Sequence, residues 1–386
     1  MRALALRPLW ICLLVALVAR LVFAFCVFPI LQQSWNLHED ADGYGLIAQT
    51  IHEGHYDDVT RGPVYPVFLA VAGSPAMAKF LQVLFDTGTC GLVFLVARRN
   101  WKAAALWAIY PFAIWRAAFI SKEVVATLLL VSYMGMQLLA LRNGKIWTWL
   151  AAGGLLALVN LCKPTFLAWP LLILALAFLH RVPLSRVAAL LAGMVVVIAP
   201  WTWRNEVVTN GAFLPVATER GGVTTFIGNY QPTLGLWEGP GKPLWLQAVE
   251  EIKLQHVDAS VVELDHIYYA AAWKEIIHDP LKATEICIRK CVRFWFLGAK
   301  RREEFGAVVI QFVYLTALGI GLRRRWPWDL EVVLMLALIV YVMLIHALTY
   351  ADLRFSVYVM PFVCVLASGM FQTRERSTEL TAAAAP

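Results

Sequence analysis

The chain has 386 residues, of which 60% are hydrophobic and 15% are charged, and its formal net charge is +7. A chain this apolar cannot fold as a water-soluble globule, so the composition excludes an ordinary soluble domain and predicts a protein covered largely by lipid. The basic excess does not indicate a nucleic-acid partner, because most Lys and Arg residues flank apolar segments, where they meet anionic lipid headgroups.

Apolar segments long enough to cross a bilayer recur along the whole chain. A hydrocarbon core of about 30 Å requires roughly 20 apolar residues in helical form. Ten segments are predicted as spans, and they run near 9–30, 76–97, 103–119, 124–141, 147–161, 165–179, 187–203, 306–322, 332–348 and 356–371. The predicted fold class is therefore an all-α polytopic membrane protein with about ten transmembrane helices.

Basic residues mark one side of these spans. Lys and Arg are enriched in short cytoplasmic loops. With the N-terminus inside, the five inside segments receive Arg98, Arg99 and Lys102; Arg142 and Lys145; Arg181 and Arg186; Arg323, Arg324 and Arg325; and Arg374 and Arg376. This pattern predicts cytoplasmic N- and C-termini and directs the acid-rich loops to the extracytoplasmic side.

Two long segments fall on that outer side. The first, 31–75, contains an amphipathic stretch at 44–51, which is predicted as a helix lying at the membrane interface. The segment 63–72 is too short to span and is predicted as a second juxtamembrane helix. The second is turn-rich at its start and mainly helical from about 244 to 278. The chain divides into an N-terminal transmembrane module, an extracytoplasmic segment, C-terminal transmembrane helices and a cytoplasmic tail, at 1–203, 204–305, 306–372 and 373–386.

Three acids, Glu39, Asp40 and Asp42, stand within four positions at the outer end of the first span. A carboxylate at such a position can accept a proton from a hydroxyl group that acts as a nucleophile. A short acidic pattern is also common in solvated loops. The local sequence alone leaves both interpretations open.

Several short motifs follow one another along the chain in a characteristic order. They are Asp40-Ala41-Asp42-Gly43-Tyr44, Arg61-Gly62-Pro63-Val64-Tyr65-Pro66, Tyr110-Pro111, Ser121-Lys122-Glu123, Lys163-Pro164-Thr165, Pro200-Trp201-Thr202-Trp203-Arg204-Asn205, Gly228-Asn229 and Asp352-Leu353-Arg354-Phe355. This set resembles bacterial GT-C glycosyltransferases, the relatives of protein O-mannosyltransferases and of the aminoarabinose transferases that modify lipid A.

The resemblance implies a GT-C-like bundle in the bacterial inner membrane with an extracytoplasmic active site. The implied reaction transfers a sugar from a polyprenyl-phosphate donor to a glycan, lipid or protein acceptor of the envelope, with inversion of configuration. The sugar and the acceptor are left open. No cofactor and no metal are included in the prediction.

The resemblance also assigns roles to individual residues. Asp40 is expected to be the catalytic base, with Asp42 and Glu39 as secondary candidates and Glu123 as a second acid near the acceptor or the base. A lipid phosphate leaving group needs positioned cations. The residues expected to contact it are Arg61, Arg204, Lys163 and Arg354. The alternative for these basic residues is interfacial snorkelling, and the alternative for Glu123 is a favourable position in the first turn of a helix.

Asp86 is predicted near the middle of a span, where an ionisable side chain is costly and often functional. Gln82 and Thr89 stand within one helical turn of it. We expect a hydrogen bond inside the bundle at this position rather than catalysis.

Two other classes of function stay open. A flippase or transporter of lipid-linked sugars is expected to show inverted repeats and polar residues at mid-membrane. A non-catalytic membrane partner in envelope glycan assembly would carry the first-loop acids incidentally. The polar residues collect at the outer edge and no repeat is visible, which favours the enzyme over the transporter.

Overall fold

The computed structural model describes residues 2–35, 43–297 and 304–371. Within these ranges all regular secondary structure is helical, which confirms the predicted all-α class for this part of the chain. The candidate acids Glu39, Asp40 and Asp42 lie outside the described residues.

The helices alternate between long apolar segments and shorter ones. The first half of the chain forms α1 (Arg2–Val22), α2 (Phe28–Trp35), α3 (Tyr44–His52), α4 (Val64–Ala72), α5 (Pro75–Val96), α6 (Trp101–Ala108), α7 (Pro111–Ala117), α8 (Glu123–Asn143), α9 (Ile146–Cys162) and α10 (Trp169–Leu179). The second half forms α11 (Leu184–Val208), α12 (Gly221–Asn229), α13 (Lys242–Gln255), α14 (Val261–His278), α15 (Pro280–Phe296), α16 (Glu304–Arg324), α17 (Leu330–Leu348) and α18 (Met360–Ala367).

Six helical segments of the described chain are long and apolar enough to cross a bilayer. They are Arg7–Ser34, Pro75–Val96, Glu123–Asn143, Leu184–Val208, Gly306–Arg324 and Leu330–Leu348. The chain is therefore a multi-pass membrane protein by the length and composition of its helices. Three shorter apolar stretches accompany them, Ile146–Cys162, Pro164–Leu179 and Met360–Phe371.

Three of the ten predicted spans are not single long helices. The segment predicted at 103–119 is split into α6 and α7, and those at 165–179 and 356–371 each combine a 3₁₀ turn with a short helix. A proline stands at or beside each break, namely Pro111, Pro170 and Pro361, each in the first turn of the helix that follows. Proline has no N–H to donate and its ring clashes with the preceding turn, so a helix begins at it rather than running through it.

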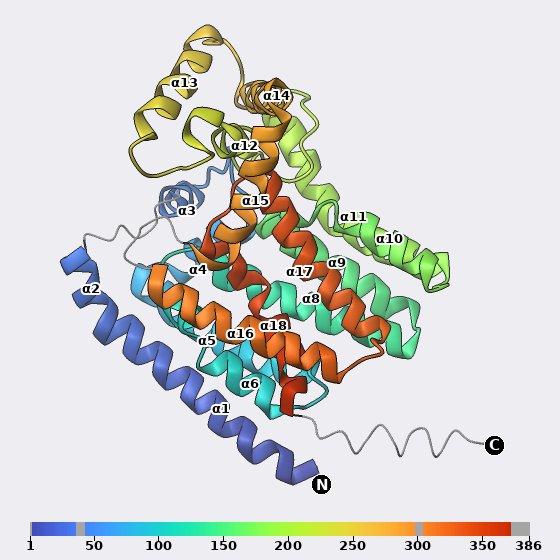
Figure 1. Ribbon diagram of the computed structural model, residues 1–386. Helices are drawn as coiled ribbons and strands as arrows, with labels where there is room; N and C mark the ends of the chain where they lie inside the picture. Colours follow the sequence, from blue (N-terminus) through green and yellow to red (C-terminus); the bar gives the residue numbers. More distant parts are fainter. Residues whose placement is uncertain (1, 36–42, 298–303, 372–386) are drawn as a thin grey trace.

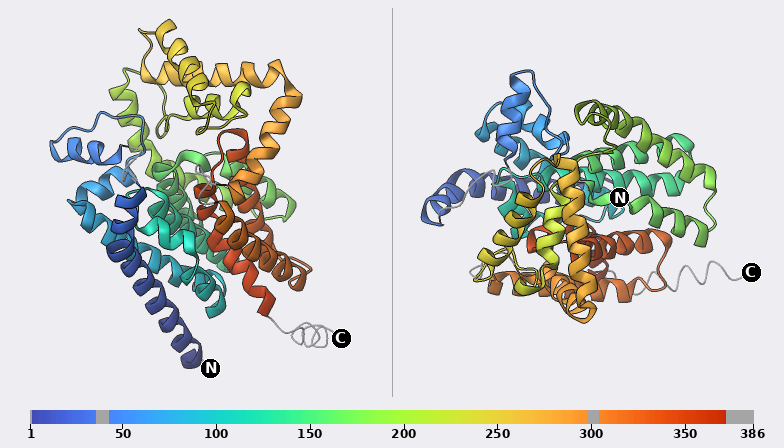
Figure 2. Two further views of the ribbon diagram at one scale, coloured as in Figure 1. Left: turned by 60° about the vertical axis from the view of Figure 1, so that its left-hand side comes forward. Right: turned by 90° about the horizontal axis from the view of Figure 1, so that it is seen from above.

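The long helices form one bundle, and α3, α12, α13 and α14 lie at one end of it (Figure 1). We call this the capped end, since α12–α15 lie over it, while α1 begins and the described chain stops at the opposite end (Figures 1 and 2). The two stretches predicted as short helices in the first long segment are helical, as α3 and α4, and their position at the membrane surface stays a prediction. The stretch predicted as helical from 244 to 278 is α13 and α14, interrupted at 256–260.

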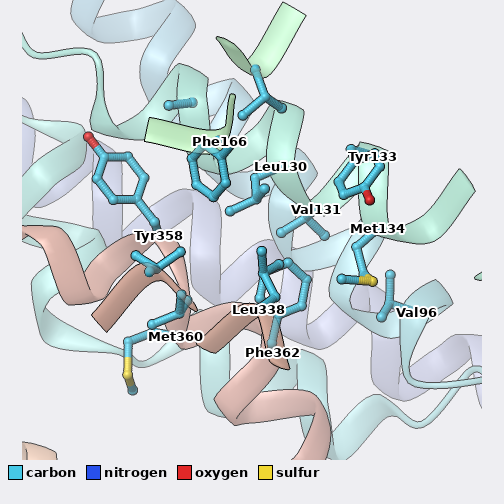
Figure 3. Packing of buried hydrophobic residues seen from close by; sticks show 14 of the residues in the cluster. Val96, Leu130, Val131, Tyr133, Met134, Phe166, Leu338, Tyr358, Met360 and Phe362 are labelled. Carbon is cyan, nitrogen blue, oxygen red and sulfur yellow. The ribbon is translucent and has the colours of Figure 1, made fainter. Parts of the chain in front are cut away.

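The interior of the bundle is built around α18. Every residue of this helix is buried, and Figure 3 shows Phe362 packed in one cluster with Leu338 of α17 and Leu130 and Val131 of α8. Helices α9 and α11 cross in backbone contact, because a Cβ at Gly153 would lie 1.9 Å from the carbonyl oxygen of Leu190. Such small-residue crossings let helices pack closely where lipid offers no hydrophobic driving force.

The partner of Asp86 differs from the prediction. Its carboxylate pairs with the guanidinium of Arg20, which comes from the first span and is fully buried. Arg20 also donates hydrogen bonds to the carbonyl oxygens of Ala108 (2.9 Å) and Trp107 (3.3 Å), at the end of α6. The expectation that Gln82 and Thr89 satisfy Asp86 is therefore wrong, although the role inside the bundle is of the expected structural kind.

The helices of the capped end are docked on the bundle through the C-terminus of α17. The buried ammonium of Lys290 on α15 donates to the carbonyl oxygen of Thr349 and to Asn229 Oδ1, each at 3.0 Å. Asn229 Nδ2 in turn donates to the carbonyl oxygen of Leu348 at 2.9 Å. These donors satisfy helix-end carbonyls and place a positive charge at the negative end of the helix dipole. Burial lowers the pKa of Lys290 to about 8.

Replacing Asp86 with Asn should destabilise the bundle strongly. The substitution leaves the Arg20 guanidinium buried without its carboxylate, and breaking a buried ion pair in this way costs about 3–5 kcal/mol. The measurement is thermal unfolding of the purified protein in detergent, with Asp258→Asn, an exposed acid between α13 and α14, as the matched control. The double variant Arg20→Met/Asp86→Leu should lose less stability than Asp86→Asn, because no unpaired charge is left buried. An unchanged melting temperature for Asp86→Asn would contradict the structural role of the pair.

Candidate functional site

Charged side chains from five parts of the chain meet at the capped end of the bundle. They come from the loop before α4, the start of α8, the break between α9 and α10, the segment before α12 and the 3₁₀ turn before α18. We call this set the capped-end cluster, and it consists of Arg61, Lys122, Glu123, Lys163, Glu219 and Arg354. Four of these six residues were predicted as site residues from the sequence.

Glu219 lies at the centre of one half of the cluster. Its Oε2 atom is 3.7 Å from Arg61 Nη1 and also contacts Lys122 Nζ, and its Oε1 atom accepts a hydrogen bond of 3.0 Å from the backbone N–H of Gly62. Burial opposes ionisation of this carboxyl, but the charges of Lys122 and Arg61 more than offset it and hold its pKa below the ordinary value. Glu219 is therefore an anion that binds two cations in a largely buried position.

Local backbone geometry explains how Glu219 reaches the first loop. The N–H of Thr218 donates to the carbonyl oxygen of Val59 at 3.1 Å, so the two long loops run against each other. Gly62 lies so close to α9 that a Cβ there would be 2.2 Å from the carbonyl oxygen of Leu161. Only glycine permits this approach, which brings the loop against the end of α9.

Tyr44 connects this ion cluster to the segment that follows the acidic motif. The guanidinium of Arg61 lies 5.3 Å from the centre of the Tyr44 ring and Lys122 Nζ lies 5.6 Å from it, both within range of cation–π attraction. The ring also meets Tyr65 edge-on at 4.9 Å. The predicted catalytic acids Asp40 and Asp42 precede Tyr44 in the chain, outside the described residues, and their roles stay predictions.

Lys163 and Arg354 form the other half of the cluster. Lys163 Nζ lies 4.5 Å from the centre of the Phe355 ring and 5.0 Å from that of Tyr358, while the Arg354 guanidinium lies 4.9 Å from the Phe355 ring. Lys163 is buried in the break between the apolar segments of α9 and α10. Burial, reinforced by the positive charge of Lys122, lowers the pKa of Lys163 to about 7.

Glu123 is buried at the first position of α8, directly after Lys122. A negative charge in the first turn is favoured by the helix dipole. The same carboxylate acts on the cluster, because its charge is one of the influences that raise the pKa of Lys163. The structure therefore combines the helix-end position with membership of the cluster.

Arg204 has contacts of a different kind. Its Nη1 donates to the carbonyl oxygen of Asp58 at 3.1 Å and to Asn205 Oδ1 at 2.9 Å, and its guanidinium lies 4.9 Å from the centre of the Tyr56 ring and 4.6 Å from that of the Trp201 ring. These contacts fasten the first loop to the end of α11. Its predicted contact with a phosphate stays a prediction, but the structure places it beside the loop rather than within the capped-end cluster.

Two members of the cluster were not selected from the sequence. Lys122 belongs to one of the motifs but has no role of its own in the prediction, and Glu219 is one of many acids in the second outer segment. The one signal in the sequence near Glu219 is the pair Gly221-Gly222, which indicates an unusual backbone turn. In the structure Glu219 and Arg220 have positive φ angles, 50° and 53°, and lead into the start of α12 at this glycine pair.

A cavity of about 300 Å³ lies between α3, α4 and the start of α5. Its lining is mostly apolar and includes Ile120, with Gln49, His52 and Ser74 as polar members. It begins one residue beyond Tyr44, at Gly45. Among the described residues no group of three His, Cys, Asp or Glu side chains is arranged to hold a metal ion.

No known family model matches this sequence, and comparison with curated proteins finds no significant relative. The class that the fold and the cluster define is therefore a multi-pass helical membrane protein with a buried group of basic and acidic side chains at one end of its bundle.

The titration of Lys163 should make anion binding dependent on pH. Below pH about 7 the ammonium is charged and attracts an anion, and above it the neutral amine does not, so the apparent affinity should fall by up to about tenfold per pH unit. Sulfate is a suitable probe, because its own charge is constant over this range. The measurement is the sulfate concentration that gives half of the maximal rise in melting temperature, from pH about 5.5 to about 8.5.

The variant Lys163→Arg provides the control for this prediction. A guanidinium stays charged throughout the range, so the variant should bind sulfate with little change between these pH values. A pH dependence of the same size in both proteins would show that another group is responsible.

Proposed function

We propose that this protein is a membrane glycosyltransferase that transfers a sugar from a polyprenyl-phosphate donor to an acceptor of the bacterial envelope. The observation that carries the proposal is the capped-end cluster, which joins four basic side chains from distant parts of the chain with two buried carboxylates. Three of the basic residues, Arg61, Lys163 and Arg354, are positions that are predicted from the sequence to contact the donor phosphate, Arg61 by its motif and the other two by their predicted depth in the membrane.

The balance of charge supports an anionic ligand. Among the described residues of the cluster, basic side chains outnumber acidic ones, and all of them are wholly or largely removed from water. Cations kept in a low-dielectric position interact strongly with an incoming anion, and little reorganisation is needed when charge develops there. A phosphate that becomes the leaving group is an anion of this kind.

The location of the cluster supports a lipid-linked donor and an extracytoplasmic site. The ends of α5, α8 and α16 opposite to the cluster carry basic residues, for example Arg98, Arg142 and Arg324, and the first two of these pair with Glu331. Under the rule that basic loops stay in the cytoplasm, the capped end faces outward. The apolar cavity beside Tyr44 has the chemistry to accept hydrocarbon from the donor or the acceptor.

In the proposed reaction Asp40 accepts the proton of an acceptor hydroxyl while that oxygen forms a bond to the anomeric carbon. The bond from the anomeric carbon to the phosphate oxygen breaks, and polyprenyl phosphate leaves. Because the attack is direct, the configuration at the anomeric carbon is inverted. The basic residues of the cluster stabilise the charge that develops on the leaving phosphate.

The test is transfer of radiolabelled sugar from a panel of polyprenyl-phosphate sugars by the purified protein in lipid, with envelope extract supplying the acceptor. The wild type should transfer from at least one donor, and Asp40→Asn should be slower by at least about 100-fold, since general-base catalysis contributes about that much. Glu250→Gln, an exposed acid of α13, serves as the control and should match the wild type.

Two results would contradict the proposal. Absence of transfer with every donor would favour a flippase or a non-catalytic partner in envelope glycan assembly. Equal transfer by the wild type and a folded Asp40→Asn would exclude Asp40 as the base and direct the search to Asp42.

A further inference from the structure

The space between Arg61 and Lys122 already holds an anion, the carboxylate of Glu219. One oxygen of this carboxylate, Oε2, contacts both cations, and the side chain is only 13% exposed. Carboxylate and phosphate oxygens use the same N–H donors, with similar hydrogen-bond geometry. A phosphate bound by Arg61 and Lys122 would therefore compete with Glu219 for these two donors.

The backbone at Glu219 adopts a conformation that is unfavourable for a residue with a Cβ. Glu219 and Arg220 both have positive φ angles, 50° and 53°, in the left-handed region that residues with a Cβ disfavour. Glu219 is held there by the two cations and by the N–H of Gly62. Backbone kept in a disfavoured conformation by surrounding contacts is characteristic of functional sites.

The same two residues lead directly into the helices that cover the site. Glu219 is two positions before Gly221, at the start of α12, where a Cβ would lie 2.2 Å from Tyr269 Oη on α14. The next residue, Gly222, donates its N–H to Asp265 Oδ1 at 2.8 Å. The start of α12, which follows Glu219, is thus fixed to α14, so an exchange of partners at Glu219 needs movement of its side chain and not of α12.

We infer that Glu219 is a displaceable counter-ion, which holds Arg61 and Lys122 in place while the site is empty and gives up these two cations when a phosphate group binds. That this phosphate belongs to a polyprenyl-linked donor rests on the proposed function. The exchange itself requires only a phosphate and the two cations. It makes Glu219 a positioning residue rather than a catalytic one.

A permanent structural role for Glu219 predicts the opposite effect of removing its charge. If the carboxylate stays bound to Arg61 and Lys122 when phosphate arrives, its loss should misplace both cations and weaken phosphate binding. If the carboxylate is displaced, its loss removes a competitor and strengthens phosphate binding. The direction of the change therefore decides between the two roles.

The experiment is a titration of the purified protein with inorganic phosphate, followed by melting temperature, for the wild type, Glu219→Gln and Glu250→Gln. We expect the concentration that gives half of the maximal shift to be about tenfold lower in Glu219→Gln, because a hydrogen bond to a charged competitor is removed. Glu250→Gln should match the wild type. An unchanged or higher concentration for Glu219→Gln, including no response in either protein, would overturn the inference.

Two further measurements test the inference even if Glu219→Gln does not fold. Glu219→Gly also removes the carboxylate, and glycine adopts a positive φ without strain, so it should show the same tenfold change. Infrared difference spectra of the wild type with and without phosphate should show a shifted carboxylate stretch. A carboxylate region without change would count against displacement.

These results are separable from those of the transfer assay. If Glu219→Gln binds phosphate more tightly but the protein transfers no sugar, the counter-ion role of Glu219 stands and only the proposed transferase activity is overturned. If the protein transfers sugar but Glu219→Gln binds phosphate more weakly, the proposed transferase activity stands and only the counter-ion role of Glu219 is overturned.

Discussion

The carboxylate of Glu219 joins the two long loops of the chain at the end of the bundle that is capped. It binds Arg61 and the Gly62 N–H of the first loop and, at the same time, Lys122 at the start of α8. This one group thus links the first loop, α8 and the approach to α12, and the hydrogen bond from Thr218 N–H to the Val59 carbonyl oxygen reinforces the link between the loops. The close approach of Gly62 to α9 then brings Lys163 and the aromatic rings beside it into the same region.

The molecule contains two groups of buried charge, and they differ in how completely they are balanced. Arg20 and Asp86 form a one-to-one pair, and the remaining donors of Arg20 are used by backbone carbonyl groups of α1 and α6. The capped-end cluster holds more cations than carboxylates among the described residues, and Lys163 is so deeply buried that its pKa falls to about 7. The balanced pair of Arg20 and Asp86 has a structural role in the bundle, whereas the capped-end cluster, with its excess of basic side chains, has the properties of a ligand site.

The helices could be predicted from the sequence wherever the length and composition of a segment determine its structure. Helices of the required length and hydrophobicity, and the short helices α3 and α4, follow from local patterns. It could not foresee which apolar segments are broken, because a proline can begin a helix or end one depending on the contacts around it. Nor could it pair Asp86 with Arg20, which is 66 residues away in the chain and was considered only as part of an apolar span. For the same reason Glu219 was not recognised, since its importance comes from two cations that lie 158 and 97 positions earlier.

The pairing of Arg20 has a consequence for the way the protein is made. Arg20 lies within the first span, Arg7–Ser34, but its ligands are Asp86 and the carbonyl oxygens of Trp107 and Ala108, the last of which is 88 residues further along. A charged residue near the centre of a lone helix raises its insertion free energy by about 2.5–3.5 kcal/mol. During synthesis the first span must therefore enter the membrane on the strength of its other side chains, and it reaches its final place only after α5 and α6 have been translated.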